Sequence, residues 1–206
     1  MILNKYLRKI RHGHIAYINP NPNIKLHYLS YIPKNVSTIL DVGCGRGELL
    51  YLLKQKGYKV SGCDMDDKII KIAKQFCKDI IFADAEQLTI FYSLNKFDLV
   101  SLIHVLEHLP NPLKGLLEAK AITNKYILLA VPNARYIISG ERDTHLYSWN
   151  YFTLKNLLKK AGLTIIKLSE NHINLMPNII RASPIINRII IRLFWNPMEI
   201  IALVHK

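Results

Sequence analysis

The sequence predicts an α/β fold in which a mostly parallel sheet has helices on both faces. Short apolar stretches rich in β-branched residues alternate along the chain with stretches of helical character, the order that builds a parallel sheet. The first of these alternations is joined by a loop with glycine at three alternate positions. At 206 residues, half of them hydrophobic, the chain can form one domain with a full core.

Seven short runs are predicted as strands. In chain order they are Thr38–Val42, Tyr58–Cys63, Asp79–Phe82, Phe97–Leu102, Tyr126–Val131, Leu163–Lys167 and Met198–His205. The segment Glu48–Lys54 is predicted as a helix, because its acidic first residue suits the positive end of a helix dipole. The first strand, the glycine loop and this helix together indicate a nucleotide-binding corner.

The glycine loop narrows the ligand. Gly43, Gly45 and Gly47 let the backbone turn tightly and approach a ligand closely. The dinucleotide fingerprint requires a third glycine at position 48, where this chain has Glu48, and no Gly-Lys-Ser/Thr follows as in a phosphate-binding loop. The loop therefore favours a nucleoside without phosphates. The alternative is a tight turn that binds nothing.

Acidic residues follow the second and third strands. Asp64 closes the second strand, where a carboxylate can accept hydrogen bonds from both hydroxyls of a ribose. Asp84 follows the third strand and can face an adenine amino group. Either residue could instead be a solvated strand end, but both lie in the order that a nucleoside site requires.

The motifs in this order resemble the class I S-adenosylmethionine-dependent methyltransferases, in particular the group called type 11/12. The resemblance spans residues 33–167 and rests on DVGCGRG, GCDMD, FADAEQL, FDLV, VLEHLPNP and WNYFTLKNLLKKAGL. It implies a Rossmann-like, doubly wound, seven-stranded sheet whose final strand, 198–206, is an antiparallel edge strand. It also implies S-adenosyl-L-methionine as methyl donor and S-adenosyl-L-homocysteine as product.

The resemblance assigns roles in cofactor binding residue by residue. The glycine loop would line the methionine part of the cofactor and Asp64 would bind its ribose. The full set expected to contact the cofactor is Asp41, Gly43, Gly45, Gly47, Asp64, Met65, Asp84, Ala85 and His104. Asp41 would support the loop and the cofactor amino group, Met65 would pack on adenine, and Ala85 would meet the adenine edge.

Histidines after the fourth and fifth strands are the candidates for catalysis. His108 and His145 are predicted to act as general base for an acceptor hydroxyl. Ubiquinone-biosynthesis O-methyltransferases and small-RNA 2′-O-methyltransferases have a metal-binding Glu-x-x-Glu-His motif here, but His104 replaces the first Glu. The metal alternative comprises His104, Glu107, His108 and His145, a donor set that suits an ion softer than Mg²⁺. We predict that no metal is bound and that at least one of these four side chains points away from the other three. Glu107 and His108 could instead brace the start of a helix.

The predicted function is methyl transfer from S-adenosylmethionine to an oxygen of a small or lipid-linked metabolite. One alternative is ribose 2′-O-methylation of RNA with a metal at the histidine cluster. Another is a non-catalytic cofactor-binding partner of a second protein. The net charge of +13, with six Lys or Arg and no acid in residues 1–34, could attract RNA, a membrane surface or an anionic small substrate. Compositional drift toward Lys is the preferred explanation for the excess as a whole.

The remaining segments are assigned to a single domain. Residues 1–34 are expected to form a helical cap, 35–167 the cofactor-binding core and 172–196 an amphipathic insert. Arg181, Arg188 and Arg192 share one face of that insert, so residues 184–195 could contact a membrane or a second copy of the chain, or could form a lid. Three cysteines without metal-site spacing and the lack of a secretory signal predict a cytoplasmic protein, either free or at the inner face of the membrane.

Overall fold

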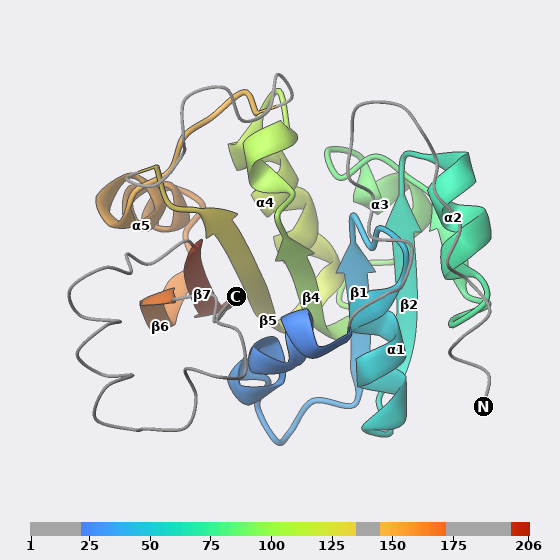
Figure 1. Ribbon diagram of the computed structural model, residues 1–206. Coiled ribbons are helices and arrows are strands. Elements are labelled where there is room, and N and C mark those ends of the chain that lie inside the picture. Colours follow the sequence, from blue (N-terminus) through green and yellow to red (C-terminus); the bar gives the residue numbers. More distant parts are fainter. Residues whose placement is uncertain (1–21, 135–144, 172–198) are drawn as a thin grey trace, which may run out of the picture.

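The computed structural model describes residues 22–134, 145–171 and 199–206, whose strands form one seven-stranded sheet of order β3-β2-β1-β4-β5-β7-β6 (Figure 1). The strands are β1 Thr38–Val42, β2 Lys59–Asp64, β3 Ile80–Phe82, β4 Phe97–Ile103, β5 Thr123–Pro132, β6 Thr164–Asn171 and β7 Glu199–His205. The helical elements are η1 Pro22–Tyr31, α1 Glu48–Gln55, α2 Asp67–Ala73, α3 Leu88–Phe91, η2 Leu106–His108, α4 Pro112–Ile122 and α5 Tyr151–Lys160. The predicted α/β class is confirmed.

The sheet is parallel except where β7 enters it. β1 pairs in parallel with β2 and β4, β2 with β3, and β4 with β5, whereas β7 is antiparallel to both β5 and β6. The antiparallel final strand is therefore confirmed, but its predicted place at the edge is wrong. β7 is buried over Glu199–Val204, while β6 carries polar residues and is mostly accessible. The apolar strand consequently lies inside the sheet and β6 forms the edge.

Helices cover both faces of the sheet, because successive residues of a strand point to opposite sides. Ile39 of β1 packs with Tyr28 of η1 and Leu49 of α1 on one face. The next residue, Leu40, packs on the other face in the cluster that contains Leu116 of α4. Figure 1 shows η1 and α1 together on one side of the strands. This two-layer cover leaves the carboxyl ends of the parallel strands as the place for a ligand.

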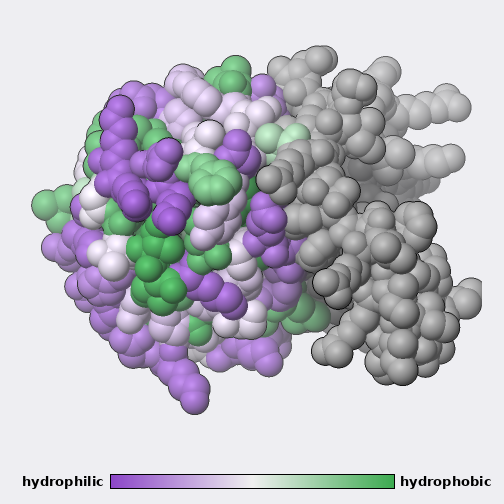
Figure 2. Space-filling model, turned by 90° about the vertical axis from the view of Figure 1, so that its left-hand side faces the viewer, coloured by the Kyte–Doolittle hydropathy of each residue, from purple (hydrophilic) through white to green (hydrophobic). Residues whose placement is uncertain are grey.

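The surface near the edge strand is mixed in character. Figure 2 shows the face at the left of Figure 1, where hydrophilic side chains surround smaller hydrophobic areas. Phe152 of α5 and Ile166 of β6 are exposed hydrophobic residues, and Lys159 and Lys160 of α5 are also exposed. Scattered apolar residues of this kind are common on protein surfaces. Within the described ranges, no helix has the length and apolar character needed to cross a bilayer.

Two of the predicted segments fall partly or wholly outside the described residues. Of the expected cap over 1–34, the structure describes the 3₁₀ helix η1 and the turn that follows it. The expected insert over 172–196, with its membrane or dimer contact through 184–195, lies outside the described ranges.

Candidate functional site

A cavity of about 440 Å³ opens at the carboxyl ends of four neighbouring strands. β1, β2, β3 and β4 each send the residues that follow them into its wall. These residues include Val42, Gly43, Asp64, Met65, Ala83, Asp84, Ala85, Glu86, His104, Val105 and His108. The cavity lies where open α/β sheets bind their ligands.

The glycine loop has the backbone conformation that its sequence indicates. Gly43, Gly45 and Gly47 have φ angles of 65°, 54° and 85°, in the left-handed region that glycine adopts without strain. A Cβ added to Gly43 would lie 2.6 Å from a methyl carbon of Val105, so this position has no room for a side chain. The loop ends at Gly47, and α1 begins at the next residue, Glu48. Gly43 itself lines the cavity, while Gly45 and Gly47 form the turn behind it.

Two aspartates at strand ends border the cavity. Asp64 accepts hydrogen bonds from the backbone N–H groups of Gly45 (2.9 Å) and Asp66 (3.1 Å), so it fixes the glycine loop as well as facing the cavity. Asp84 accepts from the N–H of Glu86 at 2.8 Å. Met65 is 58 % exposed beside the cavity, which leaves its apolar side chain free to cover a flat ring. The structure thus gathers the expected ribose and adenine residues at one edge.

Asp41 lies beneath the loop and not in the cavity wall. Its Oδ1 accepts a hydrogen bond from Ser101 Oγ at 2.7 Å, and its Oδ2 has no hydrogen-bond partner among the described residues. Burial raises the pKa of Asp41 to about 6. A buried carboxylate oxygen without a donor fits the expected role of receiving an amino group, and that role stays a prediction.

His104 has an unusual backbone and two acidic neighbours. Its φ of 58° is left-handed, which is uncommon for a residue with a side chain. Its Nδ1 lies 3.3 Å from Glu107 Oε1 and its Nε2 lies 3.2 Å from Glu199 Oε2. Burial alone would lower the pKa of His104, but the two carboxylates raise it to about 9. A helix carrying both His104 and His108 is therefore excluded, and the ring of His104 is directed to carboxylates.

Glu107, His108 and His145 form the second polar group at this edge. The carbonyl oxygen of Glu107 accepts from the N–H groups of Leu146 (2.8 Å) and Tyr147 (3.3 Å), which fastens the loop after β5 to η2. The rings of His108 and His145 then meet edge to face, with centroids 4.8 Å apart. His108 also lines the cavity.

The same group is the candidate metal site. One ligand atom each from Glu107, His108 and His145 lies within 4.8 Å of the others. One carboxylate and two imidazoles suit zinc, although bound ligand atoms lie roughly 3–4 Å apart, so the group would have to contract. The structure brings three of the four predicted donors together and directs His104 to Glu199 instead.

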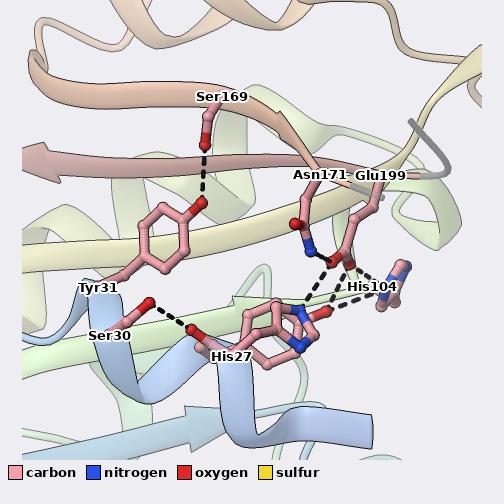
Figure 3. Close-up of polar contacts among 8 residues, drawn as sticks. His27, Ser30, Tyr31, His104, Ser169, Asn171 and Glu199 are labelled. Carbon is pink, nitrogen blue, oxygen red and sulfur yellow. Dashed lines mark hydrogen bonds and ion pairs between the residues drawn. The ribbon is translucent and has the colours of Figure 1, made fainter. Parts of the chain in front are cut away.

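Sequence reasoning singled out His104 but missed Glu199, to which it is bound, together with His27, Tyr28 and Asn171. Figure 3 shows its carboxylate at the centre of a group that includes His27, His104 and Asn171. These residues are far apart in the sequence, at positions 27, 104, 171 and 199, and share no local motif. The one available signal was a lone acidic residue, Glu199, at the start of the otherwise apolar Glu-Ile-Ile-Ala-Leu-Val.

Comparison with known proteins places the chain in a family. The family model described as a methyltransferase domain matches residues 14–168, so the chain belongs to this family. Family and fold together define a class I methyltransferase, the class that uses S-adenosylmethionine as methyl donor. The predicted family, enzyme class and cofactor are therefore confirmed.

Individual relatives share about 30 % of the aligned residues with this chain. The chain is 29 % identical to a ubiquinone biosynthesis O-methyltransferase from Nitrosomonas europaea over 167 residues, covering 78 % of this chain and 61 % of that protein. It is 31 % identical to a protein of the same name from Coxiella burnetii over 181 residues, covering 73 % and 75 %.

Solved structures share the fold. The structure of a SAM-dependent methyltransferase from Archaeoglobus fulgidus matches with a TM-score of 0.68, 23 % identity, and coverage of 90 % of this chain and 92 % of that one. A SAM-dependent methyltransferase from Mesorhizobium loti matches with a TM-score of 0.66, 18 % identity, and coverage of 87 % and 96 %.

Proposed function

We propose that the protein transfers the methyl group of S-adenosylmethionine to a phenol-like hydroxyl of a small or lipid-linked metabolite. The observation that carries this proposal is one cavity bordered by Asp64 and Asp84 on one side and by His108, packed on His145, on another. The first pair suits a nucleoside and the second supplies imidazoles for proton transfer. The name of the two bacterial relatives, ubiquinone biosynthesis O-methyltransferase, supports an oxygen acceptor.

The acidity of the acceptor favours a phenol over a sugar hydroxyl. An ordinary imidazole has a pKa of about 6.5 and an ordinary phenol about 10, a gap of about 3.5 that corresponds to about 5 kcal/mol. A sugar hydroxyl is less acidic than a phenol, so its gap to imidazole, and the free-energy cost of removing its proton, are larger. An imidazole base alone therefore suits a phenol. A ribose hydroxyl would need further activation.

In the proposed mechanism the side chains of this chain hold and align the reactants. Asp64 binds the ribose hydroxyls, and the glycine loop lets the methionine part lie against its backbone. His108 or His145 takes the hydroxyl proton as the oxygen attacks the methyl carbon in line with the departing sulfur. A metal held by Glu107, His108 and His145 would supply a lower acceptor pKa when bound.

The ribose alternative is favoured by one observation: ligand atoms of Glu107, His108 and His145 lie within 4.8 Å of one another. A metal bound there would lower the pKa of a sugar hydroxyl and so allow an imidazole to remove its proton. The basic balance of the chain, with a net charge of +13, is compatible with a nucleic acid but equally with its Lys-rich composition.

Isothermal titration with S-adenosylhomocysteine tests the cofactor site. We expect Asp64→Asn to weaken binding by at least roughly tenfold, because a charge-assisted hydrogen bond contributes about 1.5–3 kcal/mol. Asp67→Asn is the matched control, since Asp67 is an exposed aspartate of α2 that does not line the cavity. Equal affinity of the two variants would remove Asp64 from the ribose site.

A further inference from the structure

Glu199 is a fully buried carboxylate that belongs neither to the cavity wall nor to a motif. Four side chains present polar hydrogens or nitrogens to it (Figure 3). His27 Nε2 lies 2.8 Å from its Oε1 and His104 Nε2 lies 3.2 Å from its Oε2. Tyr28 donates from its hydroxyl to Oε2 and Asn171 donates from Nδ2 to Oε1 at 2.9 Å.

The topology of the sheet explains how this carboxylate reaches the cavity side. Because β7 is antiparallel, its first residue lies at the edge where the parallel strands end. Glu199 is paired with Pro132, the last residue of β5, and with Asn171, the last residue of β6. The reversed strand thus carries a residue from late in the sequence to the edge that binds ligands.

Burying a carboxylate costs free energy, so it is an unfavourable means of holding a strand in place. Removing a charge from water costs several kcal/mol, and well-packed apolar residues often replace buried ion pairs without loss of stability. Burial alone would raise the pKa of Glu199, but hydrogen bonds from His104, His27, Tyr28 and Asn171 hold it well below its ordinary range. The four side chains around Glu199 are therefore arranged to stabilise its negative charge. Packing of the strand alone does not explain this arrangement.

His104 links this group to the cavity. Its ring lies between Glu199 and Glu107, its backbone is left-handed, and its N–H donates to the carbonyl oxygen of Ala130 at 2.8 Å. His104 also lines the cavity. Its position is set by carboxylates on both sides, so loss of either one would release the ring.

The other side of the group is η1. His27 and Tyr28 lie on η1, and Tyr28 is 2 % exposed in the core beneath it. The cavity wall in the described part of the chain comes from the ends of β1 to β4, from η2 and from the two residues after it, so η1 reaches the cavity through His104. Tyr28 of η1 contacts His104 both through Glu199 and directly, with its hydroxyl oxygen 3.4 Å from His104 Nε2. A second segment of the chain therefore depends on the same carboxylate.

We propose that Glu199 is a positioning residue that holds His104 in the cavity wall and docks η1 onto the same carboxylate, so that cofactor binding and η1 docking stabilise each other. The inference rests on the proposed function in one respect, that the cavity is the cofactor site. Coupling of this kind is reciprocal: a ligand that fixes His104 strengthens the docking of η1, and η1 docking strengthens ligand binding by the same factor.

The test compares Glu199→Gln, which keeps the shape and removes the charge, with Tyr31→Phe. Tyr31 is also on η1, but its hydroxyl bonds Ser169 Oγ at 2.7 Å and does not contact Glu199. Hydrogen exchange over residues 22–31 is measured with and without S-adenosylhomocysteine, together with ligand affinity by calorimetry. We expect the ligand to slow this exchange in the natural protein and in Tyr31→Phe. In Glu199→Gln the slowing is lost and affinity falls roughly tenfold.

A merely structural role has a different signature: Glu199→Gln would then speed exchange in η1 with and without ligand alike, and the ligand-dependent slowing would persist. That result, or unchanged affinity in Glu199→Gln, overturns the inference while the proposed function stands. If Glu199→Gln does not fold, His27→Ala removes one of the two η1 contacts to Glu199 and keeps the direct contact of Tyr28 with His104. We expect partial loss of the slowing; full retention overturns the inference. Failure of the natural protein to bind S-adenosylhomocysteine would remove the proposed function and, with it, this inference.

Discussion

Three buried carboxylates, Asp41, Glu107 and Glu199, lie near the cavity, and their partners differ. Asp41 receives one hydroxyl, and burial raises its pKa. Glu199 receives four donors, and its pKa is held low. Glu107 is paired with His104, which it shares with Glu199. The contacts of each carboxylate therefore decide the direction of its pKa shift, and His104, whose pKa is raised, lies between two of the three.

His104 gives a prediction for the pH dependence of stability. Glu107 and Glu199 raise its pKa to about 9 against the burial that lowers it, so the folded state favours the protonated ring. This stabilisation is complete below the ordinary pKa of about 6.5 and is lost as the pH rises through about 9. We expect the free energy of unfolding in urea to fall between pH 6.5 and pH 9, and to fall less in His104→Gln.

The pH window keeps this test specific. Asp41 titrates near pH 6, below the window, so its contribution is nearly constant within it. The same decline in the natural protein and in His104→Gln would show that the two carboxylates do not hold a protonated ring. The exposed His205 offers a matched control, since His205→Gln changes a histidine far from these carboxylates.

Only part of the site could be predicted from the sequence. Gly43, Asp64 and Asp84 lie in short motifs at strand ends, so local patterns were sufficient to predict where they meet. Glu199 contacts His104 across 95 positions and Tyr28 across 171, and no pattern within a strand or loop records such a pairing. The conformation of His104 was also missed, because a left-handed histidine is set by its surroundings.

At the scale of elements, the predicted strands were found with small shifts. The strand predicted at Thr38–Val42 has those bounds, and its apolar residues face both helix layers. β5 begins at Thr123, three residues before the predicted start, because the polar Thr123-Asn-Lys run resembled a loop. Phe97 of β4 pairs with Thr123, so sheet pairing outweighs the weak strand propensity of this run.

Helix α5 begins with a reciprocal side-chain cap. The side chain of Asn150 accepts from the N–H groups of Phe152 and Thr153, and Thr153 Oγ1 accepts from the N–H of Asn150. Removing such a cap costs about 1 kcal/mol. We expect Asn150→Ala to lower the free energy of unfolding by that amount in urea titrations. Asn156→Ala, in the exposed middle of the same helix, should leave stability unchanged or slightly raised. Equal effects of the two changes would contradict the capping role.

At the scale of the whole molecule, one edge of the sheet collects groups from most of the chain. The ends of β1 to β4 form the cavity, η2 and the loop before α5 bring His108 and His145, and β7 brings Glu199. Their convergence follows from the parallel order, which sequence patterns predicted, and from the entry of β7 between β5 and β6, which they did not.

The chemistry at this edge can be decided with the whole enzyme. With a catechol acceptor, we expect methyl transfer to survive EDTA and to fall about a hundredfold or more in His145→Ala, because general base catalysis contributes about 10²–10⁴. His205→Ala is the control. Activity lost with EDTA and restored by Zn²⁺ or Mn²⁺ would establish a metal at Glu107, His108 and His145. It would also supply the activation that a ribose hydroxyl requires, and salt-sensitive RNA binding would then be the measurement that tests the ribose alternative.

The central position of β7 bears on the order of events during synthesis. β7 is the last of the seven strands to be made, yet it separates β5 from β6 and pairs with both along its length. While the chain is still on the ribosome, β1 to β5 can associate, but the side of β5 that β7 will cover stays open and β6 has no neighbour to join. Exposed strand edges of this kind favour association with other chains. The nascent chain therefore keeps an unpaired edge on β5, open to association with other chains, until residues 199–205 join the sheet.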